Sequence, residues 1–352
     1  MKVMAEQYNP QYWIERAQFV MEQNVVEDAK TAAEINRIIT LMYAEILKEI
    51  FAFYAKFATS EGLSVTEAKK IVDAFDVVAF KSKAKEYVKN KDFSEKANKE
   101  LKKYNVKMKI SREKLLKENL DLIVKSSTTK VEKTIENGLV DSINREVKEQ
   151  AGIILGVDLR ITKEKAEAIA NSKFHKVTWS ERLWDDMDLV REEVERITTN
   201  VVVRGRHPNE YVADFKKKTG QTTYNAKRLL TTESARAQSE AQRLSYLKTL
   251  GEDGEYEFLA SKSELPKPGF YEKGLDLSKL KDSEKTKVCP VCSELNGKVF
   301  KVKNMVPGVN AAPIHPHCRC STAPHVGNWR DKFFAERKGK YRTDKEIVID
   351  ID

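Results

Sequence analysis

All four cysteines of this 352-residue chain lie in one short segment, together with three of its five histidines. The segment begins with a Cys-x2-Cys pair, Cys289 and Cys292, and continues with the run H-P-H-C-R-C over residues 315–320. A metal ion needs soft ligands that can lose a proton, and two short loops of this kind bring such ligands together. The segment therefore predicts a small unit that folds around a metal ion.

The sequence leaves the set of metal ligands open. If Cys318 and Cys320 lie in extended chain, their side chains point the same way and complete a site of four cysteines, because side chains along a strand repeat with a period of two. If the chain turns at His315 instead, His315 and Cys318 complete a site of three cysteines and one histidine. Zn²⁺ is the natural occupant of either site, in a structural role. We expect four of the following five residues to bind it: Cys289, Cys292, His315, Cys318 and Cys320.

The same residues allow other interpretations. A thiol-rich knot would use the cysteines for packing alone, and a protein released into an oxidising medium would form labile disulfides. A catalytic zinc is disfavoured, because so many strong ligands leave no open position for water. Among the remaining histidines, we expect His325 on the surface, and His175 and His207 in structural or exposed positions.

The composition indicates a soluble helical protein with a large polar surface. Charged residues make up 33% of the chain and hydrophobic residues 41%, and the net charge is +9. No apolar run approaches the roughly 18–20 residues that a membrane span needs, and the first residues lack the apolar core of a secretory signal. In a reducing cytoplasm, paired cysteines hold metal more often than they form disulfides. Lysines are concentrated between residues 81 and 107, where they form either a solvated helix face or a surface for nucleic-acid phosphates.

The first part of the chain predicts a series of helices. Residues 9–57 have apolar side chains three and four positions apart and few Gly or Pro residues. A capping box at residues 64–67 predicts the start of the next helix. The pattern S-R-E-K at residues 111–114 predicts a further start, from which helix is expected to continue to about residue 150, with a break near Gly138.

More helices are expected in the middle of the chain. Thr162 can open one of them, and an aromatic and basic stretch over residues 175–184 leads into a strongly amphipathic helix. A break at Gly205 and Pro208 separates it from a long helix over residues 222–251. The apolar stripe of the amphipathic helix consists of Leu183, Met187, Leu189, Val190, Val194 and Ile197.

The character of the sequence changes after this last helix. Residues 256–260 predict a short strand, and residues 262–287, rich in Lys, Ser, Pro and Gly, predict an exposed loop. The pair Asn296-Gly297 predicts a hairpin turn. Residues 347–352 are strand-like or form a docking tail.

These patterns together predict a mainly α fold. An elongated helical N-terminal region precedes a small α+β C-terminal unit that zinc stabilises. We divide the chain into a helical N-terminal region (1–150), a helical middle region (151–220), a domain with the Cys/His cluster (221–330) and a C-terminal tail (331–352).

The other polar groups have simpler interpretations. Glu233 and Arg236 lie three positions apart on a helix, which predicts an ion pair on its surface. The acids over residues 181–188 suit the electrostatics of a helix start better than a metal site. The chain has no phosphate-binding loop, nucleophile elbow or zinc-protease helix, so the sequence predicts no catalytic residue.

Three motifs follow one another between residue 228 and about residue 324. The first is Arg228 followed by T-E-x-x-R at residues 232–236, and the second is C-P-V-C-S-E-L-N-G-K-V-F at residues 289–300. The third is P-I-H-P-H-C-R-C at residues 313–320. In this order they resemble the Mu F-like head morphogenesis family, the minor head proteins of tailed bacteriophages.

The N-terminal half is more loosely similar to minor head proteins of phages of low-GC Gram-positive bacteria, through Y-W-I-E-R at residues 12–16 and W-S-E-R-L-W at residues 179–184. The resemblance implies a role in virion assembly without enzymatic activity. Family members are made in the host bacterial cytoplasm and enter the procapsid in few copies. The implied partners are the portal, the scaffold or major capsid protein, and packaged double-stranded DNA.

Two alternatives come from other classes of protein. A zinc-containing nuclease would act on DNA during packaging and would need a histidine-plus-asparagine metal site beside the cysteine pair. A zinc-ribbon nucleic-acid-binding protein would draw on the lysines between residues 81 and 107.

Overall fold

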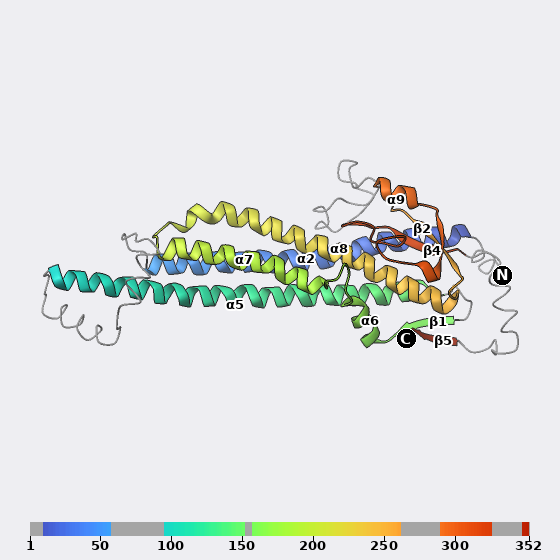
Figure 1. The fold of residues 1–352 in the computed structure, drawn as a ribbon, viewed down its shortest axis with the longest axis horizontal. Helices are drawn as coiled ribbons and strands as arrows, with labels where there is room; N and C mark the ends of the chain where they lie inside the picture. Colours follow the sequence, from blue (N-terminus) through green and yellow to red (C-terminus); the bar gives the residue numbers. More distant parts are fainter. Residues whose placement is uncertain (1–9, 58–94, 152–156, 262–288, 326–346, 352) are drawn as a thin grey trace. The chain divides into compact units, whose positions relative to one another are not determined.

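The chain in the computed structural model is mainly helical, with a small α+β region near its C-terminal end (Figure 1). The structure describes residues 10–57, 95–151, 157–261, 289–325 and 347–351. This arrangement confirms the predicted mainly α class with a small α+β C-terminal unit. None of the described helices is both long enough and apolar enough to cross a membrane.

Four long helices contain most of the described residues. They are α2 (Pro10–Phe57), α5 (Glu95–Glu149), α7 (Trp179–Val202) and α8 (Val212–Thr249). The shorter helices are α6 (Lys163–Ala170), α9 (Pro290–Leu295) and the 3-10 turns η1 (Pro208–Tyr211) and η4 (Val302–Asn304). The strands are β1 (Val157–Ile161), β2 (Glu255–Leu259), β3 (Val299–Lys301), β4 (Ser321–Pro324) and β5 (Ile347–Ile351).

Contacts divide the chain into two compact units that alternate along the sequence. The first unit consists of residues 1–37, 131–183 and 223–352, and the second of residues 38–130 and 184–222. Each of the four long helices contributes residues to both units. Compact units are thus assembled from distant stretches of sequence, and the division into consecutive domains stays a prediction.

The second unit has a core of aliphatic side chains at helical spacing. Ile39 and Met42 of α2 and Met187 and Val194 of α7 are all at most 3% exposed, as the periodicity predicted. Leu189, which the sequence placed on the same stripe, is 64% exposed. It lies two positions after Met187, which is about 200° around the helix, and therefore points away from the core.

The predicted break at Gly138 is wrong, because α5 continues through it. Gly138 allows a close approach between helices instead, since a Cβ atom at this position would lie 3.1 Å from the methyl group of Thr31 on α2. The predicted helix start at residues 111–114 is also wrong, because α5 begins at Glu95 and a serine among charged residues suits the middle of a polar helix equally well. The helix predicted after residues 64–67 lies outside the described residues.

The predicted boundaries around α6 and α8 are largely confirmed. Thr162 caps α6 by accepting a hydrogen bond from the backbone of Lys165 at 3.2 Å. The break before α8 occurs at Gly205, whose φ is +69°, and His207 has a structural role as the cap of η1. Because η1 leads directly into α8, this helix begins earlier than the predicted Thr222.

A three-stranded antiparallel sheet with the order β3-β2-β4 forms the centre of the α+β region. Tyr256 on β2 is paired with Phe300 on β3, and Phe258 is paired with Thr322 on β4. The predicted strand after α8 is confirmed as β2, and it is the strand that joins the other two.

The pair Asn296-Gly297 does not form a hairpin. Gly297 adopts the expected left-handed backbone, with φ of +77°, but the turn connects α9 to β3. The sequence identifies a backbone conformation here, and it cannot identify the neighbouring elements. The strand-like C-terminus is confirmed as β5, which pairs in parallel with β1, a strand that the sequence did not predict. The predicted loop at 262–287 lies outside the described residues.

Two hydrophobic clusters surround this sheet in the first unit. Trp13 of α2 packs in one of them with Tyr246 of α8 and Tyr256 of β2, and the rings of the two tyrosines are 6.2 Å apart. The other cluster contains Phe258 of β2 together with the buried cysteines. We define the Cys/His cluster as Cys289, Cys292, His315, Cys318 and Cys320, and its three buried cysteines are part of the core of the α+β region.

Candidate metal centre

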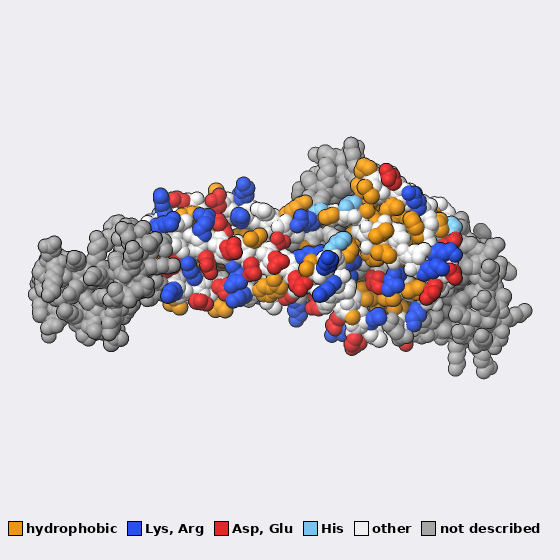
Figure 2. Space-filling model, viewed as in Figure 1, with side chains coloured by type: hydrophobic (Ala, Val, Ile, Leu, Met, Phe, Trp, Pro, Cys, Tyr) orange, Lys and Arg blue, Asp and Glu red, His pale blue; other side chains and the backbone are white. Residues whose placement is uncertain are grey.

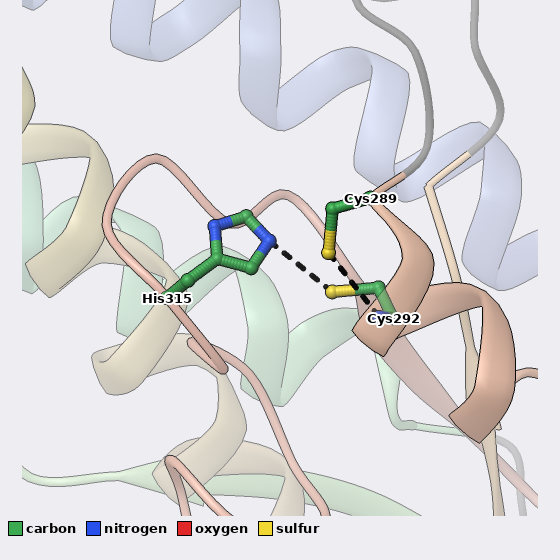
Figure 3. A group of neighbouring side chains, drawn as sticks. All are labelled: Cys289, Cys292 and His315. Atoms are coloured by element: carbon green, nitrogen blue, oxygen red, sulfur yellow. Dashed lines mark hydrogen bonds between the residues drawn. The ribbon is translucent and has the colours of Figure 1, made fainter.

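The Cys-x2-Cys pair forms the first turn of α9. Cys289 is the N-cap residue, and its Sγ atom accepts a hydrogen bond from the backbone N–H of Cys292 at 3.2 Å. Pro290 fits the next position because a first-turn residue needs no N–H partner. The cap places both sulfur atoms on the same side of the chain, facing His315 (Figure 3).

The second half of the cluster comes from the loop before β4. His317 has a φ of +63°, and this left-handed residue helps the chain to turn so that the N–H of Cys318 reaches the carbonyl of His315 at 3.1 Å. Cys320 follows directly before β4. The chain therefore has the turn at His315 that one of the two alternatives required, and the set of ligands stays a prediction.

Cys292 lies at the centre of the cluster. Its Sγ atom is 3.2 Å from Nε2 of His315 and 4.0 Å from Sγ of Cys318. Two groups share it, Cys289–Cys292–His315 and Cys292–Cys318–Cys320, and the ligand atoms within each group lie within 4.8 Å of one another. Four ligands at about 2.3 Å from a tetrahedral ion are themselves roughly 3.7 Å apart. The cluster can therefore hold a metal ion.

The imidazole of His315 is oriented as a metal ligand requires. Its Nδ1 atom is 2.8 Å from the carbonyl oxygen of Pro316. Because a carbonyl oxygen can only accept, Nδ1 carries a proton, and in the neutral ring Nε2 therefore has the lone pair. That lone pair faces Cys292. A backbone carbonyl that fixes the tautomer in this way is typical of metal-binding histidines.

The buried thiols influence one another's ionisation. Hydrogen bonds from Cys292 and Cys320 lower the pKa of Cys318. Hydrogen bonds with Cys318 and Cys320, and then burial, raise the pKa of Cys292. Neighbouring thiols in a buried site cannot all become anions on their own, so protons are shared among them. A divalent cation supplies the positive charge that would let several thiolates coexist.

The other two histidines near the cluster lie outside both groups. His317 turns towards α8, where its Nε2 atom is 3.3 Å from the hydroxyl of Tyr224. Burial, followed by the charges of Arg319 and Arg228, lowers the pKa of His317 to about 4. His325 is 3.7 Å from a carboxylate oxygen of Glu257 on β2.

Arg319 lies between the candidate ligands Cys318 and Cys320 in the sequence, and its side chain links the cluster to α2 and α8. Its guanidinium group pairs with Asp28 of α2 and donates to the hydroxyl of Thr231 on α8 at 3.1 Å. Asp28 also accepts a hydrogen bond from Ser234 at 3.1 Å. This pair could not be predicted, because its two residues lie far apart in the sequence and only the fold brings them together.

The predicted surface ion pair of Glu233 and Arg236 is wrong in its location. The two residues do pair, at 2.6 Å, but their side chains are only 0% and 4% exposed. Arg182 also donates to Glu233, at 3.0 Å. Arg236 donates further to the hydroxyl of Ser172 and to two carbonyls at the end of α6, those of Ile169 and Ala170. Periodicity could not reveal this burial, because α8 is covered on several sides in the first unit.

One of the acids near the start of α7 binds the residue that precedes the helix. Glu181 accepts hydrogen bonds from the backbone N–H of Thr178 at 2.6 Å and from its hydroxyl at 3.0 Å. These bonds, and to a smaller extent the charge of Lys173, lower the pKa of Glu181. Asp188 pairs with Arg191 at 2.7 Å. These two acids therefore serve local helix structure.

The sequence of this region matches a known family. A model of the family described as Phage Mu protein F like protein matches residues 271–323, which include all five residues of the Cys/His cluster. The match confirms the resemblance to this phage head morphogenesis family. The motif around Arg228 lies before the matched residues. Comparisons with the curated proteins and with the solved structures found no match.

Proposed function

We propose that this chain is a minor capsid protein, or head morphogenesis protein, of a tailed bacteriophage. It enters the procapsid in few copies and binds the portal, the scaffold or the major capsid protein, and it contacts packaged double-stranded DNA. The observation that supports this proposal most strongly is the family match over residues 271–323, on a segment with the Cys/His cluster in its core. The protein acts by binding and not as an enzyme.

The proposal assigns different tasks to the parts of the chain. Residues 221–330 form the head morphogenesis domain, and the helical regions 1–150 and 151–220 provide the surfaces for portal or scaffold. Residues 331–352 are the tail. The pair of Arg319 with Asp28 supports a role for the cluster in holding the domain against α2.

The proposal includes a structural zinc ion held by four of the five residues of the cluster. Three observations support it: ligand atoms within 4.8 Å of one another in each group, the contact of His315 Nδ1 with a backbone carbonyl, and the burial of Cys292, Cys318 and Cys320. A bound ion would link α9 to the loop before β4. In a small sheet region with few core residues, the energy of metal binding contributes directly to folding.

The test of the head-protein role is incorporation into particles. We expect the protein to co-purify with procapsids, in far fewer copies than the major capsid protein, when the head genes are expressed together and particles are analysed by quantitative mass spectrometry. Its absence from purified particles would refute the proposal. A variant with Cys289→Ser and Cys292→Ser should be incorporated less, because the matched domain loses its metal.

The zinc ion and the nuclease alternative are tested on the purified protein. Elemental analysis should find about one zinc ion per chain, as a single structural site requires. Metal-dependent cleavage of duplex DNA that is lost in His315→Ala would favour the nuclease instead. The two candidate ligand groups contain only cysteine and histidine, which suits a closed structural site better than a catalytic one.

A further inference from the structure

An unusual turn lies between α6 and α7. Phe174 and Val177 form an isolated antiparallel bridge, with a hydrogen bond of 3.0 Å from the N–H of Phe174 to the carbonyl of Val177. The two residues between them, His175 and Lys176, have φ values of +52° and +74°. Two successive left-handed residues are typical of tight turns that use Asn and Gly. Here the positions carry an imidazole and an ammonium group, at an energetic cost to the backbone.

The fold holds this turn in place from inside. Arg182 donates a hydrogen bond to the carbonyl of Phe174 and a second one to buried Glu233. The ring of Phe174 lies against Gly308, where an added Cβ atom would be 3.6 Å from it. The side chains of Lys173, His175 and Lys176 are exposed. A strained turn is thus fixed rigidly while its basic side chains face solvent.

The same stretch of α8 fixes a second group of polar side chains. The backbone N–H of His317 donates to the hydroxyl of Thr232 at 3.2 Å, and Thr232 is the neighbour of Glu233, which anchors the turn. The ring of His317 is 5.5 Å from that of Tyr224, and Tyr224 is 47% exposed. Arg228, one helical turn after Tyr224, is exposed. Thr232 of α8 therefore holds the loop that contains His317. The next residue, Glu233, holds the turn at residues 174–177 through Arg182.

Neighbouring residues of α8, Thr232 and Glu233, thus fix the two groups, and we call the two groups together the basic surface. Figure 2 shows histidine side chains near Lys and Arg side chains on the visible face, with Asp and Glu side chains among them. Within the described part of the chain, no ion pair engages Lys173, Lys176 or Arg228. Glu181, the carboxylate near Lys173, is already bound by Thr178. The members of the basic surface are Lys173, His175, Lys176, Tyr224 and Arg228, and His317 contacts Tyr224 beside them.

We propose that the basic surface binds the phosphodiester backbone of double-stranded DNA. Its donors are ammonium, guanidinium, imidazole and phenol groups, all of which bind phosphate oxygens. The centre of a protein–protein interface is usually depleted of charge, whereas protein–DNA interfaces are polar and strongly positive. This proposal rests on the proposed function in one respect, which is that packaged DNA is taken as the polyanion that the surface meets.

The test is DNA binding by the full-length purified protein, measured by fluorescence anisotropy with a labelled duplex at several salt concentrations. In the triple variant Lys173→Gln/Lys176→Gln/Arg228→Gln we expect the affinity to fall by about tenfold or more. The slope of log affinity against log salt should become shallower by roughly 2–3, because up to three phosphate contacts are lost.

The control variant removes the same charges elsewhere in the first unit. Arg37→Gln/Lys298→Gln/Lys301→Gln also replaces one arginine and two lysines, all of them exposed. We expect its salt slope to stay close to that of the original protein. Equal losses in the two triple variants, or no binding of the duplex by the original protein, would overturn the proposal.

Two further measurements keep the result unambiguous. Lys176→Gly removes one charge and relieves the strained backbone, so weaker DNA binding in this variant is not a folding defect. Polyglutamate is the probe for an acidic protein partner. If the triple variant loses polyglutamate binding but keeps its affinity for DNA, the proposal is wrong. Since the assay uses purified protein, its outcome is independent of incorporation into procapsids.

Discussion

Arg236 and Glu233 form a hydrogen-bonded ion pair at 2.6 Å inside the first unit, with 4% and 0% of their side chains exposed. The pair does more than neutralise charge. Through Arg236 it binds carbonyls at the end of α6, and through Arg182 it holds the carbonyl of Phe174. The sequence predicted that Glu233 and Arg236 lie on the surface of a helix. In the structure they form a buried polar group that joins α6, α7 and α8.

The first prediction concerns this buried pair. Arg236→Ala should lower the free energy of unfolding by about 3–5 kcal/mol, because it removes the buried partner of Glu233, whose carboxylate then keeps the partly exposed Arg182 as its donor. The variant with both Glu233→Leu and Arg236→Leu should lose less than the sum of the single changes. Urea unfolding followed by circular dichroism measures both.

A matched control for this prediction lies on α2. Arg37 and Glu34 have the same spacing and the same 2.6 Å contact, but their side chains are 61% and 42% exposed. Arg37→Ala should leave the unfolding midpoint unchanged, since solvent screens an exposed pair. If the two arginine variants behaved alike, burial would not explain the effect of Arg236.

The second prediction concerns metal content. Cys292→Ser should abolish zinc binding, because Cys292 belongs to both ligand groups. Without the ion the melting temperature should fall, and a chelator should produce the same fall in the original protein. Elemental analysis and thermal denaturation provide the two measurements. Retention of zinc by Cys292→Ser would contradict the proposed site.

The third prediction separates the two possible ligand sets. A site of four cysteines should keep its zinc in His315→Ala and lose it in Cys320→Ser. A site of three cysteines and His315 that uses Cys318 should show the reverse. Cobalt substitution gives an independent reading, because the visible spectrum of bound Co²⁺ differs between four sulfur ligands and a set with one nitrogen. Loss of metal in neither variant would refute both sets.

Local signals in the sequence predicted local structure well. Thr162 caps α6 because its hydroxyl needs only the N–H of Lys165, three positions away. A turn at Asn296-Gly297 was predicted for the same reason, although it does not close a hairpin. The Cys/His cluster could also be predicted, because short loops bring its two halves together and the chain offers no other cysteines.

Features that depend on distant contacts could not be predicted in this way. Gly138 reads as a helix breaker, and only the presence of Thr31 shows that it is a packing position. The pairing of β1 with β5 joins strands from distant parts of the chain. The burial of Glu233 depends on Arg182 of another helix. In each case the partner is far away in sequence, and a single sequence carries no signal that identifies it.

The fourth prediction concerns pH and buried Glu146 on α5. Its carboxylate accepts hydrogen bonds from Gln150 at 2.7 Å and Gln242 at 2.9 Å, and burial raises its pKa. A raised pKa in the folded state stabilises the protein while the group is protonated, and this stability is lost as the pH rises through the folded pKa. Glu146→Gln should therefore increase stability at neutral pH and bring little gain below about pH 4, where the unfolded glutamate is also protonated. Melting temperatures of both proteins from pH 4 to 8 measure the difference, and an equal gain at every pH would contradict the assignment.

The fifth prediction concerns the turn at His175 and Lys176. The variant Lys176→Gly should be more stable by roughly 1 kcal/mol, because glycine adopts a φ of +74° without strain. The neighbouring change Lys173→Gly removes the same charge outside the left-handed positions, and it should be neutral or destabilising because it adds freedom to the unfolded chain. Denaturation of the two variants under the same conditions separates backbone strain from charge. If Lys176→Gly were no more stable than Lys173→Gly, the turn would not be strained. If Lys176→Gly were more stable but bound DNA less tightly, the protein would keep the strained backbone because the Lys176 side chain contributes to DNA binding.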